Sequence, residues 1–278
     1  MMQSFKHLNN AGTLLLILLG IVGIILLCVA MPLLQMGKRR KQKKVDRFLL
    51  QILAAQSDGY KDVLTAAFGK IRKLSHALPG DGKELMISYA KDVPLLDCPN
   101  DDCPFCSFKT NYGWIDFHVL NGKISFVNFE TAPHLMDISR CVIEKVTFYP
   151  ELFSTPGKQM LETQTKEFPA DWGNAVADLP PFQERFISAY LNAYRITLPA
   201  TLQELFRCCN GASSGKWCIY GMHEWSRCAF GAKNLWSIGC LEETIYLLLD
   251  DSGKFYTCDD DMPPEEIAKP LTEFLKGL

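Results

Sequence analysis

The sequence predicts an α+β protein with an N-terminal transmembrane helix, a middle β-rich α+β unit, and a C-terminal antiparallel sheet flanked by helices. Three observations predict it: an uncharged apolar run near the N-terminus, strand-like runs around a hairpin dipeptide in the middle, and mixed helical and strand periodicity after residue 180. The chain has 278 residues, of which 48% are hydrophobic, enough for a packed core and one large or two small domains.

The N-terminal part contains the predicted membrane span. Residues 12–34 read GTLLLILLGIVGIILLCVAMPLL, and no charged side chain occurs between Ala11 and Gly37. A helix of about 20 such residues crosses a hydrocarbon layer of about 30 Å. A cleaved signal peptide is the alternative, but its apolar region usually has about 7–15 residues and ends at small residues. The sequence therefore predicts a short tail, residues 1–11, followed by a single span.

The charges that flank the span predict its orientation. A basic run covers residues 38–47, whereas the tail carries only Lys6 and His7. The positive-inside rule then places everything after the span in the cytoplasm, so we expect a single-pass protein of the cell membrane. In that reducing compartment the eleven cysteines are expected to be mostly thiols. The overall charge of −2 gives no attraction to nucleic acid.

Residues 35–82 are predicted to form a basic juxtamembrane segment and an amphipathic helix or two. The apolar residues of the stretch from Val45 to Leu78, including Ile71 and Leu74, follow helical spacing, and Gly59 is a possible break. The Pro and Gly residues that follow Leu78 are typical of a helix end.

Residues 83–153 change to a β-rich pattern. Two strand-like runs flank Asn121-Gly122, a dipeptide that favours a tight hairpin. The predicted strands are 113–120, 123–130 and 141–150. The polar residues 154–179 that follow are predicted to be a linker.

Residues 180–278 are predicted to form the C-terminal domain. Helices are expected at 182–194 and 201–208, and a final helix is expected from Asp261 to Leu278, with Glu265 and Glu266 in its first turns. The predicted strands are 217–220, 234–238, 244–249 and 254–257.

The C-terminal domain resembles the SUKH superfamily, which includes bacterial immunity proteins, fungal cell-wall-synthesis regulators and proteins of large DNA viruses. The residues that carry this resemblance are LPATLQELFRCCNG at 198–211, WSIG at 236–239, TIYLLLDDSGKFYTC at 244–258 and EEIAKPLTEFLKGL at 265–278. The resemblance implies a noncatalytic protein that binds a partner protein. In the bacterial branch the partner would be a polymorphic toxin, and in the fungal or viral branches the role would be that of a regulatory scaffold.

No constellation of residues predicts an enzyme. Gly211 and Gly215 enclose three residues instead of the four of a phosphate-binding loop, and Lys216 is followed by Trp217 rather than by Ser or Thr. Ser213 or Ser214 near His223 and Glu224 has no nucleophile elbow around it.

A cysteine cluster is the sharpest candidate for a site. Cys98, Cys103 and Cys106 have C-x4-C-x2-C spacing, and with Cys141 they could bind zinc tetrahedrally. An iron–sulfur cluster, ordinary thiols or a redox pair are the alternatives. His118 or His134 could replace one ligand. A membrane-tethered zinc or redox protein is therefore the alternative function.

The candidate partner-binding residues lie in the C-terminal domain. Trp225, in a polar HEWSR context, and Arg227 are of the types that dominate interface energies. An acidic strip would suit a basic toxin such as a nuclease. Its candidate residues are Asp250, Asp251, Asp259 and Asp260. Ordinary solvated turns, a helix start for the second half of the strip, and a cation site are the other interpretations.

Overall fold

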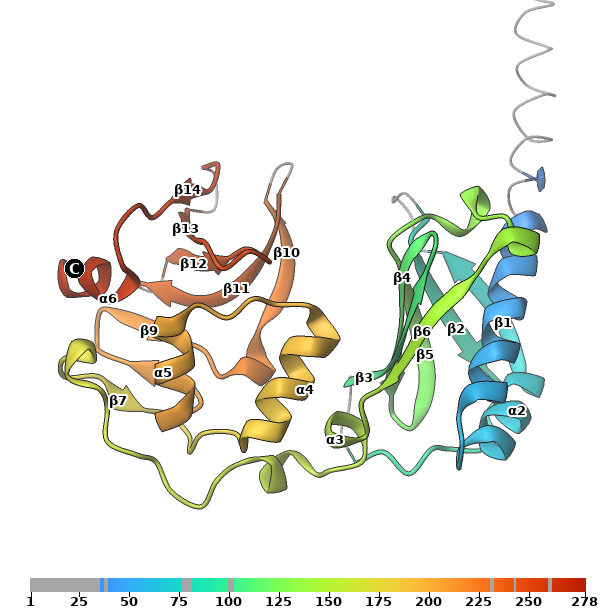
Figure 1. The fold of residues 1–278 in the computed structure, drawn as a ribbon, viewed down its shortest axis with the longest axis horizontal. Coiled ribbons are helices and arrows are strands. Elements are labelled where there is room, and N and C mark those ends of the chain that lie inside the picture. The colour runs from blue at the N-terminus through green and yellow to red at the C-terminus, as the bar shows by residue number, and fades with distance from the viewer. Residues whose placement is uncertain are drawn as a thin grey trace, which may run out of the picture. The chain divides into compact units, whose positions relative to one another are not determined.

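The computed structural model describes residues 36–37, 40–76, 82–99, 103–230, 233–242, 244–259 and 262–278 (Figure 1). The predicted membrane span, residues 12–34, lies outside these ranges. Within them, no helix has both the length and the apolar character that crossing a membrane requires.

The chain divides into two compact units, each of which is α+β. Of the described residues, the first comprises those up to 94 with 108–115 and 126–145, and the second comprises those in 95–107, 116–125 and 146–278. The predicted fold class is confirmed to the extent that the protein is α+β with antiparallel sheets.

The first unit begins with two helices. One covers residues 40–56 and the other, α2, covers Lys61–Gly69. The first helix buries Val45, Leu49 and Leu53, which recur every four residues and so share one face. The predicted break is confirmed, because Gly59 lies between the helices with φ +84. Few residues other than glycine adopt such a φ without strain.

The predicted helix does not continue past Gly69. Residues Ile71–His76 form strand β1, which pairs antiparallel with β2, Glu84–Tyr89. The helical prediction for Ile71 and Leu74 is therefore wrong. Leu74 pairs with Ile87 across the two strands. A short apolar run fits either periodicity, and pairing with a distant strand decides between them.

The helix of residues 40–56 is joined to β1 by a polar pair whose carboxylate is buried. Asp46 is 1% exposed, and its Oδ2 lies 3.1 Å from Nε2 of His76. The other ring nitrogen, Nδ1, donates to the carbonyl oxygen of Gly82 at 2.9 Å. Burial raises the pKa of the Asp46 carboxyl, while the hydrogen bond and charge of His76 oppose that rise.

The first sheet has six strands in the order β1-β2-β5-β4-β3-β6. Its remaining strands are β3 (Cys103–Thr110), β4 (Gly113–Leu120), β5 (Lys123–Phe129) and β6 (Ile143–Phe148). These confirm the three strands predicted in this region. Asn121 and Gly122 have φ 51 and 70, and two positive φ values are what a tight hairpin turn requires.

The second sheet follows the order β14-β13-β12-β11-β9-β8-β7, and β10 pairs with β11 beside this path. Its principal strands are β9 (Trp217–Ile219), β10 (Ser226–Phe230), β11 (Lys233–Leu241), β12 (Ile245–Leu249) and β13 (Phe255–Cys258). The shorter strands are β7 (Val176–Ala177), β8 (Ala212–Ser213) and β14 (Glu265–Glu266). The sequence predicts four of these strands, β9, β11, β12 and β13, but it does not predict β10 or the three short ones.

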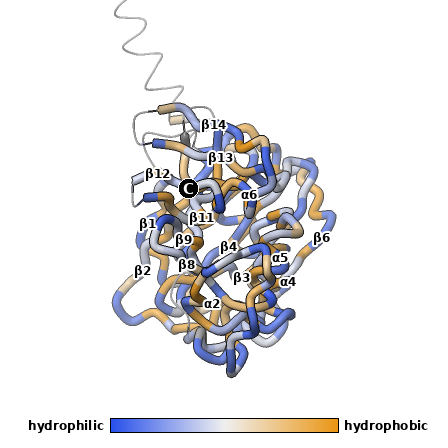
Figure 2. Tube along the Cα trace, turned by 90° about the vertical axis from the view of Figure 1, so that its left-hand side faces the viewer, coloured by the Kyte–Doolittle hydropathy of each residue, from blue (hydrophilic) through white to orange (hydrophobic). Residues whose placement is uncertain are grey.

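Helices accompany the second sheet. They are α3 (Pro150–Phe153), α4 (Glu184–Tyr194), α5 (Ala200–Cys208) and α6 (Leu271–Lys276). The helices predicted at 182–194 and 201–208 are confirmed by α4 and α5. Hydrophobic and hydrophilic residues alternate over short distances along the trace, as amphipathic elements require (Figure 2).

The final helix begins ten residues later than predicted. Glu265 and Glu266 form β14, which pairs with Thr257 and Tyr256 of β13, and α6 starts only after Pro270. The predicted start near Asp261 is therefore wrong. In the sequence, Pro263 and Pro264 are a signal for a helix start. In the structure, the helix begins after Pro270 instead.

The main core of the second unit lies between its sheet and its helices. Leu202, Leu205 and Phe206 of α5 are at most 1% exposed and pack against Ile238 and Leu247 of the sheet. The segment predicted as a linker, 154–179, also contributes, because Trp172 is 4% exposed and its ring lies 5.9 Å from that of Trp217.

Candidate functional site

Two of the predicted partner-binding residues meet at the surface of the second unit. Arg227 of β10 and Asp251 of the β12–β13 turn form an ion pair with a 2.5 Å N–O distance. The indole Nε1 of Trp236 donates to Asp251 at 3.0 Å, and the Arg227 guanidinium lies 5.3 Å from the Trp236 ring centre. The guanidinium therefore lies over an aromatic ring while a carboxylate fixes its position.

This Arg227–Asp251–Trp236 cluster remains accessible. The side chains of Arg227 and Asp251 are 41% and 47% exposed, whereas Trp236 is buried at 3%. The turn is held from the other side by Thr197, whose backbone N–H donates to the Asp251 carbonyl at 3.2 Å. The cluster offers a charged group that is already oriented, which lowers the ordering cost of binding.

Asp250 binds groups of its own turn, whereas its neighbour Asp251 binds Arg227. Its Oδ1 accepts hydrogen bonds from the backbone of Ser252 and Lys254, both at 2.9 Å, and its Oδ2 accepts from the Tyr256 hydroxyl at 3.1 Å. Partial burial favours the neutral acid, but these hydrogen bonds outweigh it and hold the pKa of Asp250 below its ordinary value. Asp250 therefore closes the turn.

The predicted exposure of Trp225 is not found. The residue is 6% exposed, its ring packs edge-on against Phe206 at 5.5 Å, and its Nε1 donates to the Tyr220 carbonyl at 3.1 Å. Trp225 belongs to the core for the usual reason that an aromatic ring supplies large buried area. Asp259 is exposed, and Asp260 lies outside the described residues.

Asn210 organises the loop that carries His223. Asn210 is 1% exposed, its Oδ1 accepts from the Met222 N–H at 2.9 Å, and its Nδ2 lies 3.1 Å from His223 Nδ1. Glu224 accepts the Gly221 N–H at 3.0 Å. Ser213 donates to Asp178 at 3.3 Å. His223 and Glu224 therefore have a structural role in this loop. Ser213 is bonded to a carboxylate and not to a histidine that could act as its base.

The structure brings two of the four predicted cysteine ligands, Cys98 and Cys103, close together. The sulfur atoms of Cys98 and Cys103 lie 3.7 Å apart, and Cys103 and Cys106 are buried. Burial raises the pKa of the Cys106 thiol, which disfavours the thiolate that metal binding or redox chemistry needs. Cys141 belongs to the other compact unit.

The described part of the chain contains no candidate metal centre. Its His, Cys, Asp and Glu side chains form no group of three or more that could hold a metal ion. His118 is buried at 7%, and burial together with Arg195 lowers its pKa to about 4 against the opposing charge of Asp116. His134 lies in a short 3-10 helix, Pro133–Leu135.

The sequence does not predict one polar network of the second unit, which joins Arg195, Asp116, Ser107 and Tyr149. Arg195 donates from its two terminal nitrogens to the two carboxylate oxygens of Asp116, at 2.9 and 2.5 Å. Asp116 also accepts from the Ser107 hydroxyl at 2.6 Å, and the Tyr149 hydroxyl donates to Ser107 at 3.0 Å. Arg195 has φ 56, a left-handed conformation at the end of α4. Tyr149 and Arg195 lie 42 and 79 residues from their partners in the chain, so no local sequence pattern predicts the network.

The comparisons with known proteins leave the family open. The chain gives no match to a family model, to a curated protein or to a solved structure. The resemblance to the SUKH superfamily therefore stays a prediction from the sequence.

Proposed function

We propose that the protein is a single-pass membrane protein whose cytoplasmic C-terminal SUKH-like domain binds a partner protein without catalysis. The partner we propose is a toxin that the protein neutralises as an immunity protein. A regulatory scaffold at the membrane uses the same binding chemistry and is distinguished by the identity of the partner. The proposal is supported by the sequence resemblance, the apolar residues 12–34 and one feature of the second sheet.

The open edge of β10 is the observation that carries the proposal. Among the described residues, β10 pairs with β11 alone, so no described strand pairs with its other edge. Such an edge is a template onto which another chain can add a strand. Arg227 lies within this strand, and its ion pair with Asp251 holds a charge beside the edge. Backbone pairing supplies affinity, and the placed charge supplies selectivity.

Charge reversal at Arg227 tests this surface. We expect Arg227→Glu in the full chain to weaken partner binding at least tenfold, because the new carboxylate faces Asp251 and disorders the cluster. The partner is first captured from the source cells with the detergent-solubilised full chain, and its affinity is then measured with the two purified proteins. Coexpression of the wild-type chain with the partner should suppress the toxicity of the partner. Coexpression of the Arg227→Glu variant should suppress it less.

Arg207→Glu is the matched control. Arg207 is an exposed residue of α5, and its reversal makes the same change in net charge. Equal affinities of the Arg227→Glu and Arg207→Glu variants would exclude β10 as the binding edge. A captured partner whose toxicity is not suppressed by coexpression would refute immunity and leave a scaffold.

A second candidate function uses Cys98, Cys103 and Cys106, and the short distance between the first two sulfurs favours it. As a zinc site, the purified full chain would contain one equivalent of zinc, and Cys103→Ser would lose it. Cys258→Ser, at a buried cysteine of β13, is the control. Zinc below a tenth of an equivalent in the wild type, together with no oxidised Cys98–Cys103 pair by mass spectrometry, would refute this candidate.

A further inference from the structure

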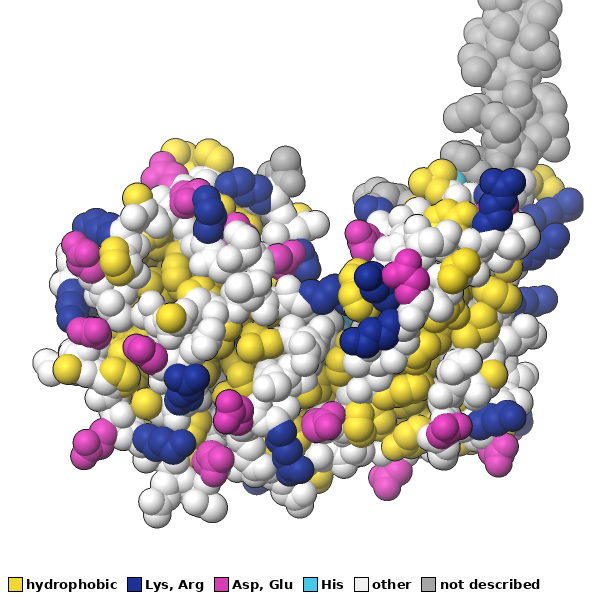
Figure 3. All heavy atoms as spheres, in the orientation of Figure 1, with side chains coloured by type: hydrophobic (Ala, Val, Ile, Leu, Met, Phe, Trp, Pro, Cys, Tyr) yellow, Lys and Arg dark blue, Asp and Glu magenta, His cyan; other side chains and the backbone are white. Residues whose placement is uncertain are grey.

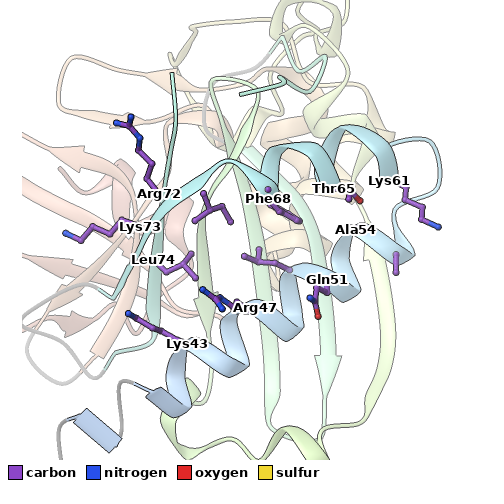
Figure 4. Close-up of a pocket in the computed structure, with 14 residues that line it drawn as sticks. Lys43, Arg47, Gln51, Ala54, Lys61, Thr65, Phe68, Arg72, Lys73 and Leu74 are labelled. Carbon is purple, nitrogen blue, oxygen red and sulfur yellow. The ribbon is translucent and has the colours of Figure 1, made fainter. Parts of the chain in front are cut away.

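The first unit contains a basic groove that the proposed function does not use. It has a volume of about 690 Å³ and is bounded by the helix of residues 40–56, by α2 and by β1. Figure 4 shows Lys43, Arg47 and Gln51 following one another along the first helix, with Phe68 on α2 and Leu74 on β1. The first helix supplies these residues at intervals of four, so they share one face.

The groove is lined by cations and no anions. Five of its described lining residues are basic, and none is Asp or Glu. The basic residues are Lys43, Arg47, Lys61, Arg72 and Lys73. Over residues 40–76 the chain carries nine Lys and Arg and three Asp, a net charge of +6. Figure 3 shows Lys and Arg side chains gathered along the side of this unit where that helix lies. Such a surface attracts a ligand with several negative charges.

A strand irregularity places two of these cations on the groove. In an ordinary strand the adjacent residues Arg72 and Lys73 would point to opposite faces of the sheet. Here the β1–β2 register shifts between Ile71, which pairs with Tyr89, and Lys73, which pairs with Ser88. Such a bulge re-aims side chains, and both Arg72 and Lys73 line the groove.

The floor of the groove is apolar. Leu50 is 3% exposed, and Phe68, Ile71 and Leu74 are partly buried beside it. A small hydrated anion would gain little from this floor. A ligand with a phosphate group and an attached apolar part can use the cations and the floor together.

The position of the groove in the chain identifies the source of such a ligand. Lys43 is nine residues after Leu34, the last residue of the predicted membrane span. Nine residues reach at most about 30 Å, so the groove stays close to the lipid surface if the span is anchored. The cytoplasmic leaflet carries anionic lipids that attract basic segments, and tethering raises their effective concentration.

We propose that this basic groove binds the phosphate-bearing headgroup of an anionic phospholipid, such as phosphatidylglycerol, with the lipid's glycerol and first acyl carbons on the apolar floor. The inference deepens the proposed function, because it relies on the membrane anchor. Lys43 and Arg47 meet the phosphate from the first helix, and Arg72 and Lys73 meet it from β1. Arg contributes paired donors to phosphate oxygens, and Lys contributes a point charge.

Native mass spectrometry of the detergent-solubilised full chain tests this binding. Phosphatidylglycerol and phosphatidylcholine of the same acyl chains are titrated in, and we expect at least tenfold tighter binding of phosphatidylglycerol. The triple variant Arg47→Gln, Arg72→Gln, Lys73→Gln should remove at least nine tenths of that preference. Equal affinity for the two lipids, or a preference unchanged in the triple variant, would overturn the proposal.

A second triple variant controls for charge and folding. Lys91→Gln, Lys145→Gln and Lys166→Gln remove three exposed cations that do not line the groove. This variant should keep the full preference for phosphatidylglycerol over phosphatidylcholine. Its unfolding midpoint should equal that of the groove variant, so that a difference in lipid binding is not a difference in folding. Glycerol 3-phosphate serves as the soluble source of the same chemistry. If it binds the groove as tightly as phosphatidylglycerol does, the lipid assignment is overturned.

The failure of this inference is distinguishable from that of the proposed function. Extraction of the protein from membranes by alkaline carbonate would refute the anchor, and with it the source assigned to the lipid, whatever binds the groove. A wild-type protein that shows no lipid preference while partner binding and the anchor are intact would refute the groove alone. Arg227→Glu, which affects the other unit, should leave the lipid preference unchanged.

Discussion

Replacing Gly239 by alanine is expected to destabilise the C-terminal unit by about 3 kcal/mol or more and to lower its melting temperature by about 10 °C. Gly239 lies near the C-terminal end of β11 and pairs with Ile219 of β9. A Cβ at this position would lie 2.1 Å from the Cys218 carbonyl oxygen and 3.1 Å from the Ile219 Cα. Both are backbone atoms, so relief requires β9 to move away from β11.

Urea and thermal unfolding of the full chain in detergent measure this effect, with Gly69→Ala as the control. A Cβ on Gly69, at the end of α2, would meet nothing within 4 Å. Because alanine also favours a helix over glycine, we expect this variant to be as stable as the wild type or slightly more stable. A Gly239→Ala variant with an unchanged midpoint would contradict the β9–β11 pairing.

Acidification is expected to destabilise the protein by about 3 kcal/mol through His118 alone. Burial is the main reason that the pKa of His118 falls to about 4, and Arg195 adds to it while Asp116 opposes it. In the unfolded chain the imidazole has its ordinary pKa of about 6.5. Between these values the unfolded chain binds a proton that the folded chain does not. The contribution of His118 to stability is therefore complete above pH 6.5 and is lost progressively as the pH falls from 6.5 to about 4.

The free energy of unfolding, measured between pH 7 and 4, tests this prediction when the wild type is compared with His118→Gln and His118→Phe. Other groups that titrate in this range are common to all three proteins, so they cancel in the difference. The wild type should lose stability relative to both variants by about 1.4 kcal/mol per pH unit between pH 6.5 and 4. Parallel pH profiles would mean that the pKa of His118 is the same in the folded and the unfolded state, which would contradict the prediction.

Local signals predicted much of the secondary structure. The hairpin at Asn121-Gly122 was predictable because a tight turn needs positive φ at both residues, which this dipeptide tolerates. The helices α4 and α5 were predictable from apolar residues on one face, and β12 and β13 from the apolar run and the turn residues between them. In each of these segments the preference of the residues agrees with the contacts that the fold provides.

Errors arose where a distant partner decides the local structure. Ile71 and Leu74 fit a helix as well as a strand until β2 pairs with them, and Glu265 and Glu266 fit a helix start until β13 does. The site residues show the same division. The chemical types of Arg227 and Asp251 make them candidates for binding, but only the β10–β11 hairpin and the β12–β13 turn bring them together. The burial of Trp225 follows from its packing on Phe206.

The sequence by itself determined the α+β class, the antiparallel hairpins, α4 and α5, and the concentration of positive charge after residue 37, because composition, periodicity and turn chemistry are local properties. Only the tertiary structure decided that Arg72 and Lys73 join Lys43 and Arg47 on one groove, that Arg195 meets Asp116, and that β10 lies at an edge of its sheet. Strand pairing, register and burial depend on residues far apart along the chain, and no local pattern contains that information.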